Sequence, residues 1–370
     1  MKRIIALLLA LLMVFALVAC AAKEDSKPAD DAADAPASDD AAASDAPAAD
    51  GERDPYELVY MCATFGNVWC KNIEIAMKSL EEEYNFTLLS TDVDYDFDLW
   101  MTNVETYCDQ GVDGFVLNCD ETMTQRTFEV TSEYGIPWIT ESTAVRDSNG
   151  VLQTPGVELD AYGVGQGVGQ LIVDNYKEYF GVDSIDPSKA ALISVSYTTV
   201  KSFNDRCQGV KDTVSAEFPG ITIFEPDLLA QGSITADCAY NEISPILASN
   251  PDIEYWFISG VVDDWGLGGA RAAESAGIED KTLVVSAGGE ALILEWDNGY
   301  DGCWKYCYYF EAMDYVEYII PGMIDVLDGK TTLEDLWPEW EEEGSDYASV
   351  KISGANCDSS NYLYLIKMRY

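Results

Sequence analysis

Residues 111–143 contain a strand, a helix and a second strand in immediate succession. The apolar run Gly114–Leu117 stops at polar residues, and a helical pattern follows it. Gly135 stands where a helix C-cap belongs, and Pro137 prevents the helix from continuing. The second apolar run covers Trp138–Thr140. This succession is typical of a βαβ unit, which predicts an α/β fold with a parallel sheet and a right-handed crossover.

Both strands of this unit end in small or polar residues. Asp120 closely follows the first strand, and Glu141, Ser142 and Thr143 follow the second. Because ligands bind outside the carboxyl ends of the strands in open α/β sheets, we expect Asp120, Glu141, Ser142 and Thr143 to contribute to a binding site. The alternative is that these residues belong to ordinary loops that leave the strands.

The N-terminus has two basic residues, an unbroken apolar run over Ile4–Ala19, and then Cys20. This pattern predicts a signal peptide over residues 1–19, because the run is shorter than the roughly 20 residues that span a bilayer. Leu17–Cys20 resembles the lipobox of bacterial lipoproteins. The resemblance implies cleavage before Cys20, lipidation of its sulfur and an extracytoplasmic protein anchored to the cell membrane. The alternative is a soluble secreted protein whose cysteine stands there by chance.

The segment that follows, residues 20–54, is rich in Ala, Asp, Pro and Ser and almost lacks large apolar side chains. Such a segment cannot bury enough surface to offset its chain entropy, so we expect a disordered acidic tether. The whole chain has 66 acidic and 21 basic residues and a formal charge of −45. Nucleic acid is therefore excluded as a partner, since binding to phosphates needs a basic surface.

Ten cysteines are present, and Cys20 leaves an odd number of nine. An extracytoplasmic location permits disulfides, but the spacings form no repeated framework. Cys62 and Cys119 each fall near the end of a predicted strand, whereas Cys303 and Cys307 are four residues apart. Bridges and unpaired buried thiols both remain open.

The alternation of strands and helices occurs twice along the chain, which predicts two doubly wound halves. The first half has strands at 57–63, 86–90, 114–117 and 138–140, with helices at 68–84 and 99–110 before the opening unit. The second has strands at 190–195, 221–224, 255–259 and 282–286, with helices at 163–179, 203–218, 236–248 and 266–276. A long helix over 303–327 and strand-like segments at 348–352 and 362–366 complete the prediction.

Several stretches, in order, resemble the type I periplasmic binding proteins, the ribose- and galactose-binding family of transporter receptors. They are Asn103–Glu105 with Gln110–Gly114, Gly135–Thr140, Val157–Asp160 with Gly163 and Gly167, Arg206–Gly209, and Asp263–Gly268 with Ala276–Gly277. The similarity covers roughly residues 56–335. No single stretch is specific, but their order and spacing together indicate the fold.

The resemblance implies two Rossmann-like lobes that are joined by three crossovers and close on a small molecule. The first lobe would comprise residues 55–158 and about 305–335, the second 159–304, and residues 336–370 would pack back on both. The implied function is capture of a sugar, a sugar-like molecule or a nucleoside for delivery to the permease of an ABC transporter. A sensory receptor that presents its ligand to a signalling partner is the alternative.

Carried over residue by residue, the resemblance makes Arg206 and Asp263 ligand contacts. The guanidinium of Arg206 can hold two oxygens at once, and Asp263 matches an acid that accepts from sugar hydroxyls. The alternatives are a surface arginine at Arg206 and an N-cap of helix 266–276 at Asp263. Three aromatic side chains provide flat apolar faces for a ring, or belong to the core: Phe65, Trp69 and Trp265. Asn67 offers an amide in the first loop.

Two positions depart from the pattern of the sugar receptors. Their Asp-Arg pair after the fourth strand is replaced by Glu141, Ser142 and Thr143. Their later Asp is replaced by a stretch over 287–289, with Glu290 just beyond it. These changes put simple pyranoses in doubt and leave a nucleoside or an oligosaccharide open as the ligand.

The chain has no histidine, which excludes Ser-His and Cys-His catalysis and histidine metal sites. The glycine-rich stretch at 163–169 lacks the dinucleotide-binding spacing, and no P-loop is present. We therefore expect no enzyme activity, no cofactor and no bound metal. A glycan hydrolase that uses two carboxylates, or a purely structural lipoprotein, are the remaining alternatives.

Overall fold

The computed structural model describes residues 53–62, 65, 68–94, 96–118 and 121–367. The predictions for Cys20, Asn67, Asp120 and Cys119 lie outside these residues. The chain from Arg53 onward forms one compact unit. Within the described ranges, no helix is long and apolar enough to cross a membrane.

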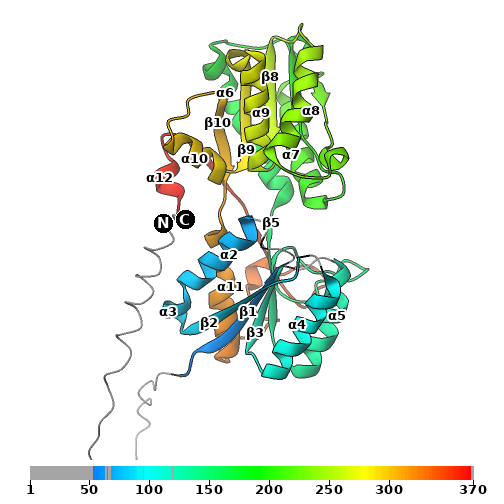
Figure 1. The fold of residues 1–370 in the computed structure, drawn as a ribbon, viewed down its shortest axis with the longest axis vertical. Coiled ribbons are helices and arrows are strands. Elements are labelled where there is room, and N and C mark those ends of the chain that lie inside the picture. Colours follow the sequence, from blue (N-terminus) through cyan, green and yellow to red (C-terminus); the bar gives the residue numbers. More distant parts are fainter. Residues whose placement is uncertain (1–52, 63–64, 66–67, 95, 119–120, 368–370) are drawn as a thin grey trace, which may run out of the picture. The chain divides into compact units, whose positions relative to one another are not determined.

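The first sheet has six strands in the order β11-β5-β4-β3-β1-β2, all of them parallel to their neighbours (Figure 1). Their bounds are β1 Tyr56–Cys62, β2 Phe86–Asp92, β3 Gly114–Asn118, β4 Trp138–Ser142, β5 Gly156–Leu159 and β11 Ser349–Ile352. The helices of this part are α2 Val68–Ser79, α3 Glu81–Tyr84, α4 Phe97–Gln110, α5 Glu121–Tyr134 and α11 Ala312–Leu327. The predicted βαβ unit is confirmed as β3, α5 and β4.

Side chains of β1 alternate between two cores, as the period of a strand requires. Leu58 and Tyr60 join the core beneath α2 and α11, whereas Val59 and Met61 join the core beneath α4 and α5. All four side chains are fully buried. A strand that is covered on both faces reads as a continuous apolar run, which is why this strand was predictable from the sequence.

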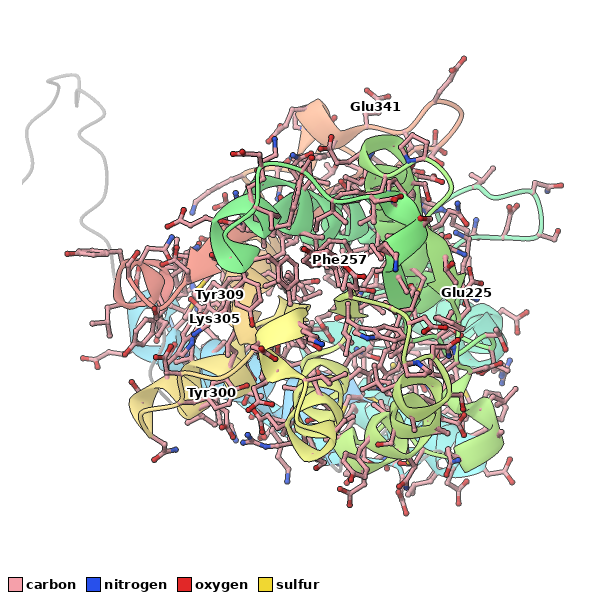
Figure 2. The ribbon with its side chains drawn as sticks, turned by 90° about the horizontal axis from the view of Figure 1, so that it is seen from above. Glu225, Phe257, Tyr300, Lys305, Tyr309 and Glu341 are labelled. Carbon is pink, nitrogen blue, oxygen red and sulfur yellow. The ribbon has the colours of Figure 1, made fainter. Side chains whose placement is uncertain are left out.

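The second sheet also has six strands, in the order β12-β10-β9-β8-β6-β7, and only β12 runs antiparallel to its neighbour. Their bounds are β6 Ala190–Ser194, β7 Thr222–Phe224, β8 Tyr255–Gly260, β9 Thr282–Gly288, β10 Trp304–Tyr309 and β12 Ala355–Asp358. The helices are α6 Ala161–Phe180, α7 Lys201–Glu217, α8 Ala236–Ser249, α9 Asp263–Ala276, α10 Glu290–Asp297 and α12 Tyr362–Leu365. Phe257 lies in the interior, while Glu225 and Glu341 are exposed (Figure 2).

Three crossovers connect the two sheets, as predicted. The chain passes from β5 to α6, returns from β10 to α11, and passes again from β11 to β12. We call the part built on the first sheet the first lobe and the part built on the second sheet the second lobe.

The segment 303–327 is not one helix, so that prediction is wrong. Trp304–Tyr309 forms β10 of the second sheet, and the helix begins only at Ala312. Apolar runs of this length suit a strand or a helix equally well, and the aromatic residues of this one favour a strand. The segment at 362–366 is a short helix instead of a strand, and the sequence prediction missed β12.

Two glycines allow α6 and α7 to approach each other closely. A Cβ atom added at Gly165 of α6 would lie 2.0 Å from the backbone oxygen of Arg206 in α7. A Cβ atom added at Gly209 would lie 2.3 Å from the backbone oxygen of Tyr162. Because these neighbours are backbone atoms, they cannot rotate away. The glycines therefore set the position of the helix that carries Arg206.

We predict that Gly165→Ala lowers the free energy of unfolding by about 1–3 kcal/mol, because the new methyl group forces the two helices apart. Chemical denaturation followed by circular dichroism measures this change. Gln166→Ala alters an exposed neighbour on the same helix and should shift the free energy by less than about 0.5 kcal/mol. An equal effect of both variants would contradict the close approach.

Candidate functional site

A cavity of about 1280 Å³ lies between the carboxyl ends of the strands of both sheets. Asn118 and Ser142 reach it from the ends of β3 and β4, and Ala287 and Gly288 reach it from the end of β9. This is the edge at which open α/β sheets bind ligands. The cavity is larger than the roughly 300–1000 Å³ of a typical small-molecule site.

Glu141 is fully buried behind the wall of this cavity and does not line it. Its Oε2 accepts hydrogen bonds from Asn118 Nδ2 at 2.7 Å and from the Tyr60 hydroxyl at 3.3 Å. Its Oε1 accepts from Trp69 Nε1 at 2.8 Å and from the hydroxyl of Ser142. Burial raises the pKa of this carboxyl, and the four donors act in the opposite direction. Glu141 therefore orients the wall, whereas the sequence predicted that it contacts the ligand.

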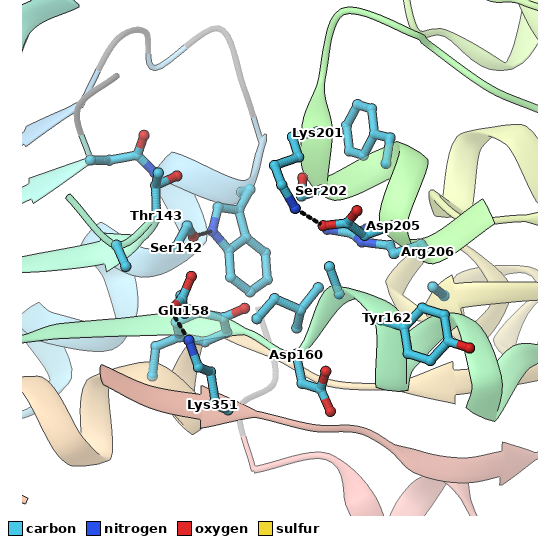
Figure 3. Close-up of a pocket in the computed structure, with 18 of the residues that line it drawn as sticks. Ser142, Thr143, Glu158, Asp160, Tyr162, Lys201, Ser202, Asp205, Arg206 and Lys351 are labelled. Carbon is cyan, nitrogen blue, oxygen red and sulfur yellow. Dashed lines mark hydrogen bonds and ion pairs between the residues drawn. The ribbon is translucent and has the colours of Figure 1, made fainter. Parts of the chain in front are cut away.

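Trp69 and Ser142 both donate to Glu141 and both line the cavity, in which Figure 3 labels Ser142. The indole Nε1 of Trp69 also donates to Ser142 Oγ at 2.8 Å. Ser142 has a φ of 62°, in the left-handed region that residues other than glycine rarely adopt. Such a conformation costs about 1–3 kcal/mol and is typical of functional sites, where surrounding bonds hold it in place.

The guanidinium of Arg206 lines the cavity from α7. Its Nη1 donates to the backbone oxygen of Val261 at 2.8 Å, and its Nε is buried without an acceptor. The Cζ atom lies 5.3 Å and 5.9 Å from the ring centroids of Phe203 and Phe310. Burial lowers the pKa of Arg206 to about 10, so the group stays charged at neutral pH. No carboxylate of the described residues forms an ion pair with it.

Asp263 lines the cavity at the start of α9, but its carboxylate is occupied by other parts of the second lobe. Oδ2 accepts from the backbone N–H groups of Gly289 and Ala291, both at 2.8 Å, and Oδ1 accepts from the Ser286 hydroxyl at 2.9 Å. Burial raises the pKa of Asp263 to about 6. The N-cap of α9 is Val262, so Asp263 holds the first turn of α10 instead of capping its own helix.

Glu290, the first residue of α10, lines the cavity and connects the two lobes. Both of its carboxylate oxygens lie 2.8 Å from Nδ2 of Asn72, which is buried in α2. Burial raises the pKa of Glu290 to about 7, with a smaller contribution from the charge of Asp263.

Two of the predicted aromatic contacts do not line the cavity. Trp265 is fully buried in the core, where its Nε1 donates to the backbone oxygen of Ile234 at 2.8 Å. Phe65 packs beside Tyr60, with ring centroids 6.0 Å apart. Trp265 follows Asp263 by two positions on α9, and residues two apart point in different directions from a helix. Trp265 therefore belongs to the core and Phe65 packs against it, which is the alternative that the sequence analysis left open for these side chains.

The sequence analysis missed two aromatic residues of the cavity, Phe310 and Tyr315. Trp69 packs edge-on against both, with ring centroids 5.9 Å and 5.1 Å apart. Phe310 lies in the second crossover and Tyr315 lies in the helix α11 that follows it. The sequence analysis predicts this whole segment, 303–327, as one helix. The change from aromatic-rich strand to helix at Phe310 was the signal that could have identified them.

Charged residues of the crossovers line the cavity close to Ser142, and these were also missed (Figure 3). Glu158 of β5 and Lys351 of β11 face each other in register and form an ion pair. Arg146 bonds to Glu158 at 3.0 Å and to Glu342 at 2.7 Å. Among the described residues, no group of three or more ligand side chains could hold a metal ion.

The sequence of this chain matches the family described as "Periplasmic binding protein domain" over residues 58–331. The chain belongs to this family. It is 21% identical to the L-arabinose-binding periplasmic protein of an ABC transporter from Azospirillum brasilense over 245 residues, which cover 64% of this chain and 71% of the relative.

Solved structures share the fold of this binding protein. The periplasmic ribose ABC transporter protein from Conexibacter woesei superposes with a TM-score of 0.65 at 16% identity and covers 85% of this chain and 96% of its own. The arabinose-binding component from Shewanella sp. ANA-3, bound to L-arabinofuranose, gives 0.64 at 14% identity and covers 84% and 94%. The predictions of the family and of the two-lobed fold are confirmed.

We predict that Trp69→Phe lowers the free energy of unfolding by about 1–3 kcal/mol, because Glu141 then loses a donor while it stays buried. Urea denaturation measures the loss. The matched control is Trp340→Phe, since the indole of Trp340 makes no side-chain hydrogen bond among the described residues. If the two variants lost equal stability, the loss would reflect ring size and not the bond to Glu141.

We also predict that stability falls as the pH rises from about 4.5 to 7. The folded state raises the pKa of Glu290 from 4.5 to about 7, so it binds this proton more tightly than the unfolded chain. In that window, ionisation favours unfolding by an amount on the order of 1 kcal/mol. Glu290→Gln should flatten the dependence, measured by urea unfolding at several pH values, and the exposed Glu339→Gln should not. An unchanged slope in Glu290→Gln would contradict this assignment.

Proposed function

We propose that this protein captures a sugar or sugar-like solute in its interlobe cavity and delivers it to the permease of an ABC transporter. Membership of the periplasmic binding protein family supports the role in transport. The similar proteins carry names that refer to arabinose and ribose, which supports a carbohydrate as the class of ligand.

The guanidinium of Arg206, which forms no ion pair among the described residues and whose Nε has no acceptor there, is the observation that carries the proposal. A buried polar group without a partner costs about 1–3 kcal/mol, and more when it is charged. The Nε of Arg206 has no acceptor in the part of the chain that the structure describes, and the side chain lines the cavity. A solute with two neighbouring oxygens would satisfy the guanidinium through paired hydrogen bonds. Sugars carry such oxygens on adjacent carbons.

The aromatic residues of the cavity suit the other property of a sugar, its apolar C–H face. Trp69 packs edge-on against both Phe310 and Tyr315, and all three side chains line the cavity. The carboxylates are less available, because Asp263 already accepts three hydrogen bonds. We infer that donors from the protein to oxygens of the solute dominate recognition. A ligand larger than one pyranose is compatible with a cavity of 1280 Å³.

We further propose that the protein is held at the outer face of the cell membrane by lipid on Cys20, through a tether over residues 20–54. The apolar leader and the Leu-Val-Ala-Cys sequence support this. More than one acyl chain on one residue gives stable anchoring, where a single chain is marginal. Non-enzymatic binding completes the proposal.

The test combines native mass spectrometry of the purified protein with thermal shifts over a panel of sugars and nucleosides. We predict that one compound raises the melting temperature and that Arg206→Ala weakens its binding by about 10- to 100-fold, through the loss of charge-assisted hydrogen bonds. Arg271→Ala is the control, because Arg271 pairs with Glu274 and Glu295 and does not line the cavity.

Other outcomes would point to other functions. Chemical conversion of a bound compound would favour a glycan hydrolase that uses Asp263 and Glu290, whose pKa values are raised to about 6 and 7. Binding without an associated permease would favour a sensory receptor. No shift and no bound mass over the whole panel would contradict the proposal.

A further inference from the structure

Two buried cysteines face each other across the antiparallel edge of the second sheet. Cys307 of β10 and Cys357 of β12 are direct partners in the register of these strands. Their exposed fractions are 0% and 1%. Both are free thiols in this structure, and burial, followed by the neighbouring Cys357 thiol, raises the pKa of Cys307.

Directly opposed residues of antiparallel strands have Cα atoms about 4.5–5.5 Å apart. Disulfides join cysteines whose Cα atoms are about 4.4–6.8 Å apart, so the register already provides the necessary geometry. We propose that Cys307 and Cys357 form a disulfide that fastens the C-terminal crossover to the second lobe. This proposal needs only an extracytoplasmic location, where disulfides persist, and not the identity of the solute.

The bond forms by oxidation of two thiols, which release two protons and two electrons. A disulfide of a thiol–disulfide oxidoreductase accepts the electrons and becomes a dithiol, through a mixed disulfide with one of the two cysteines. Because both sulfurs are buried in the folded protein, the exchange takes place before β12 has docked against β10. The finished bond is then shielded from reductants.

The position of the bond gives it a structural role. β10 leads into the crossover to α11, and β12 ends the crossover that leaves β11. The bond therefore joins the crossover that leaves the second sheet at β10 to the crossover that enters this sheet at β12. It closes the segment 307–357 into a loop, which restricts the unfolded chain and stabilises the folded one.

The sulfur of Cys307 also supports the cavity. A Cβ atom added at Gly289 would lie 2.7 Å from Cys307 Sγ, so this sulfur packs directly beneath the turn at 288–289. The same turn donates the Gly289 N–H to the carboxylate of Asp263. A bond at Cys307 would restrict the sulfur against which the turn at 288–289 packs, and Gly288 of this turn lines the cavity.

Other buried cysteines show whether the test is specific. Cys62, at the end of β1, and Cys70, in the first turn of α2, are a second pair of buried thiols, and the nearby Cys70 thiol raises the pKa of Cys62. Cys303 is buried close to Cys307 in the sequence, and its thiol lies 3.9 Å from the backbone oxygen of Ala270. Cys303 is the matched control, since it is a buried thiol outside the proposed pair.

The experiment is a peptide map of the full chain, expressed with its leader and purified from the membrane fraction without reductant. Free thiols are alkylated under denaturing conditions before proteolysis and mass spectrometry. We predict a cross-linked peptide that contains Cys307 and Cys357, with Cys303 alkylated. Alkylation of both Cys307 and Cys357 without prior reduction would overturn the proposal, as would a bridge from either to another cysteine.

A second measurement compares the melting temperature of the oxidised protein with that of protein reduced by dithiothreitol while unfolded and then refolded with the reductant present. Reduction should lower it by about 5 °C, as expected for a loop of this length in a protein of this size. Cys357→Ala should abolish this reductant effect and Cys303→Ala should keep it. An equal reductant effect in Cys357→Ala would overturn the proposal. Because neither measurement includes a solute, failure here leaves the proposed function intact, and failure of the solute panel leaves the disulfide intact.

Discussion

The buried carboxylate of Glu141 organises the cavity wall of the first lobe. Moving a carboxylate out of water costs several kcal/mol, which only nearby donors can offset. Here the donors come from four elements: β1, α2, β3 and β4. Each donor side chain is oriented by the same two oxygens. These hydrogen bonds hold the side chains at the carboxyl ends of the strands in fixed positions relative to one another.

The second lobe uses Asp263 in a comparable way. Its carboxylate accepts hydrogen bonds from a hydroxyl of β9 and from two backbone N–H groups at the start of α10. Each wall of the cavity thus has an acid whose oxygens are already engaged within its own lobe. Arg206 is the contrasting group, because no carboxylate among the described residues forms an ion pair with it and its Nε has no acceptor there. Its guanidinium consequently offers the cavity a hydrogen-bond donor that is not already used.

The sequence was sufficient for the order of the elements as far as β9 and for the edge of the sheets that forms the site. Strands covered on both faces are continuous apolar runs, and polar residues at their ends mark the edge where ligands bind. This reasoning predicted Ser142, whereas Arg206, Asp263 and Glu290 came from comparison with the pattern of the family that the chain resembles. All four line the cavity.

The direction of single side chains was not predictable in the same way. Glu141 precedes Ser142 by one position, yet the first lies behind the wall and the second lines it. Trp265 lies in the core for a similar reason, two positions after Asp263. These outcomes depend on hydrogen bonds between distant elements, which one sequence does not reveal. The strand at 304–309 was mistaken for helix because short apolar runs suit both.

The bonds from Asp263 to α10 have a consequence for the divergence of ligand preference in this protein. A substitution at that position would change a side chain that lines the cavity and, at the same time, release the first turn of a helix. Ser202 and Phe203 line the same cavity without a comparable side-chain bond to another element. Changes of specificity are therefore more accessible to evolution at these neighbours, where a new side chain does not also undo the docking of α10.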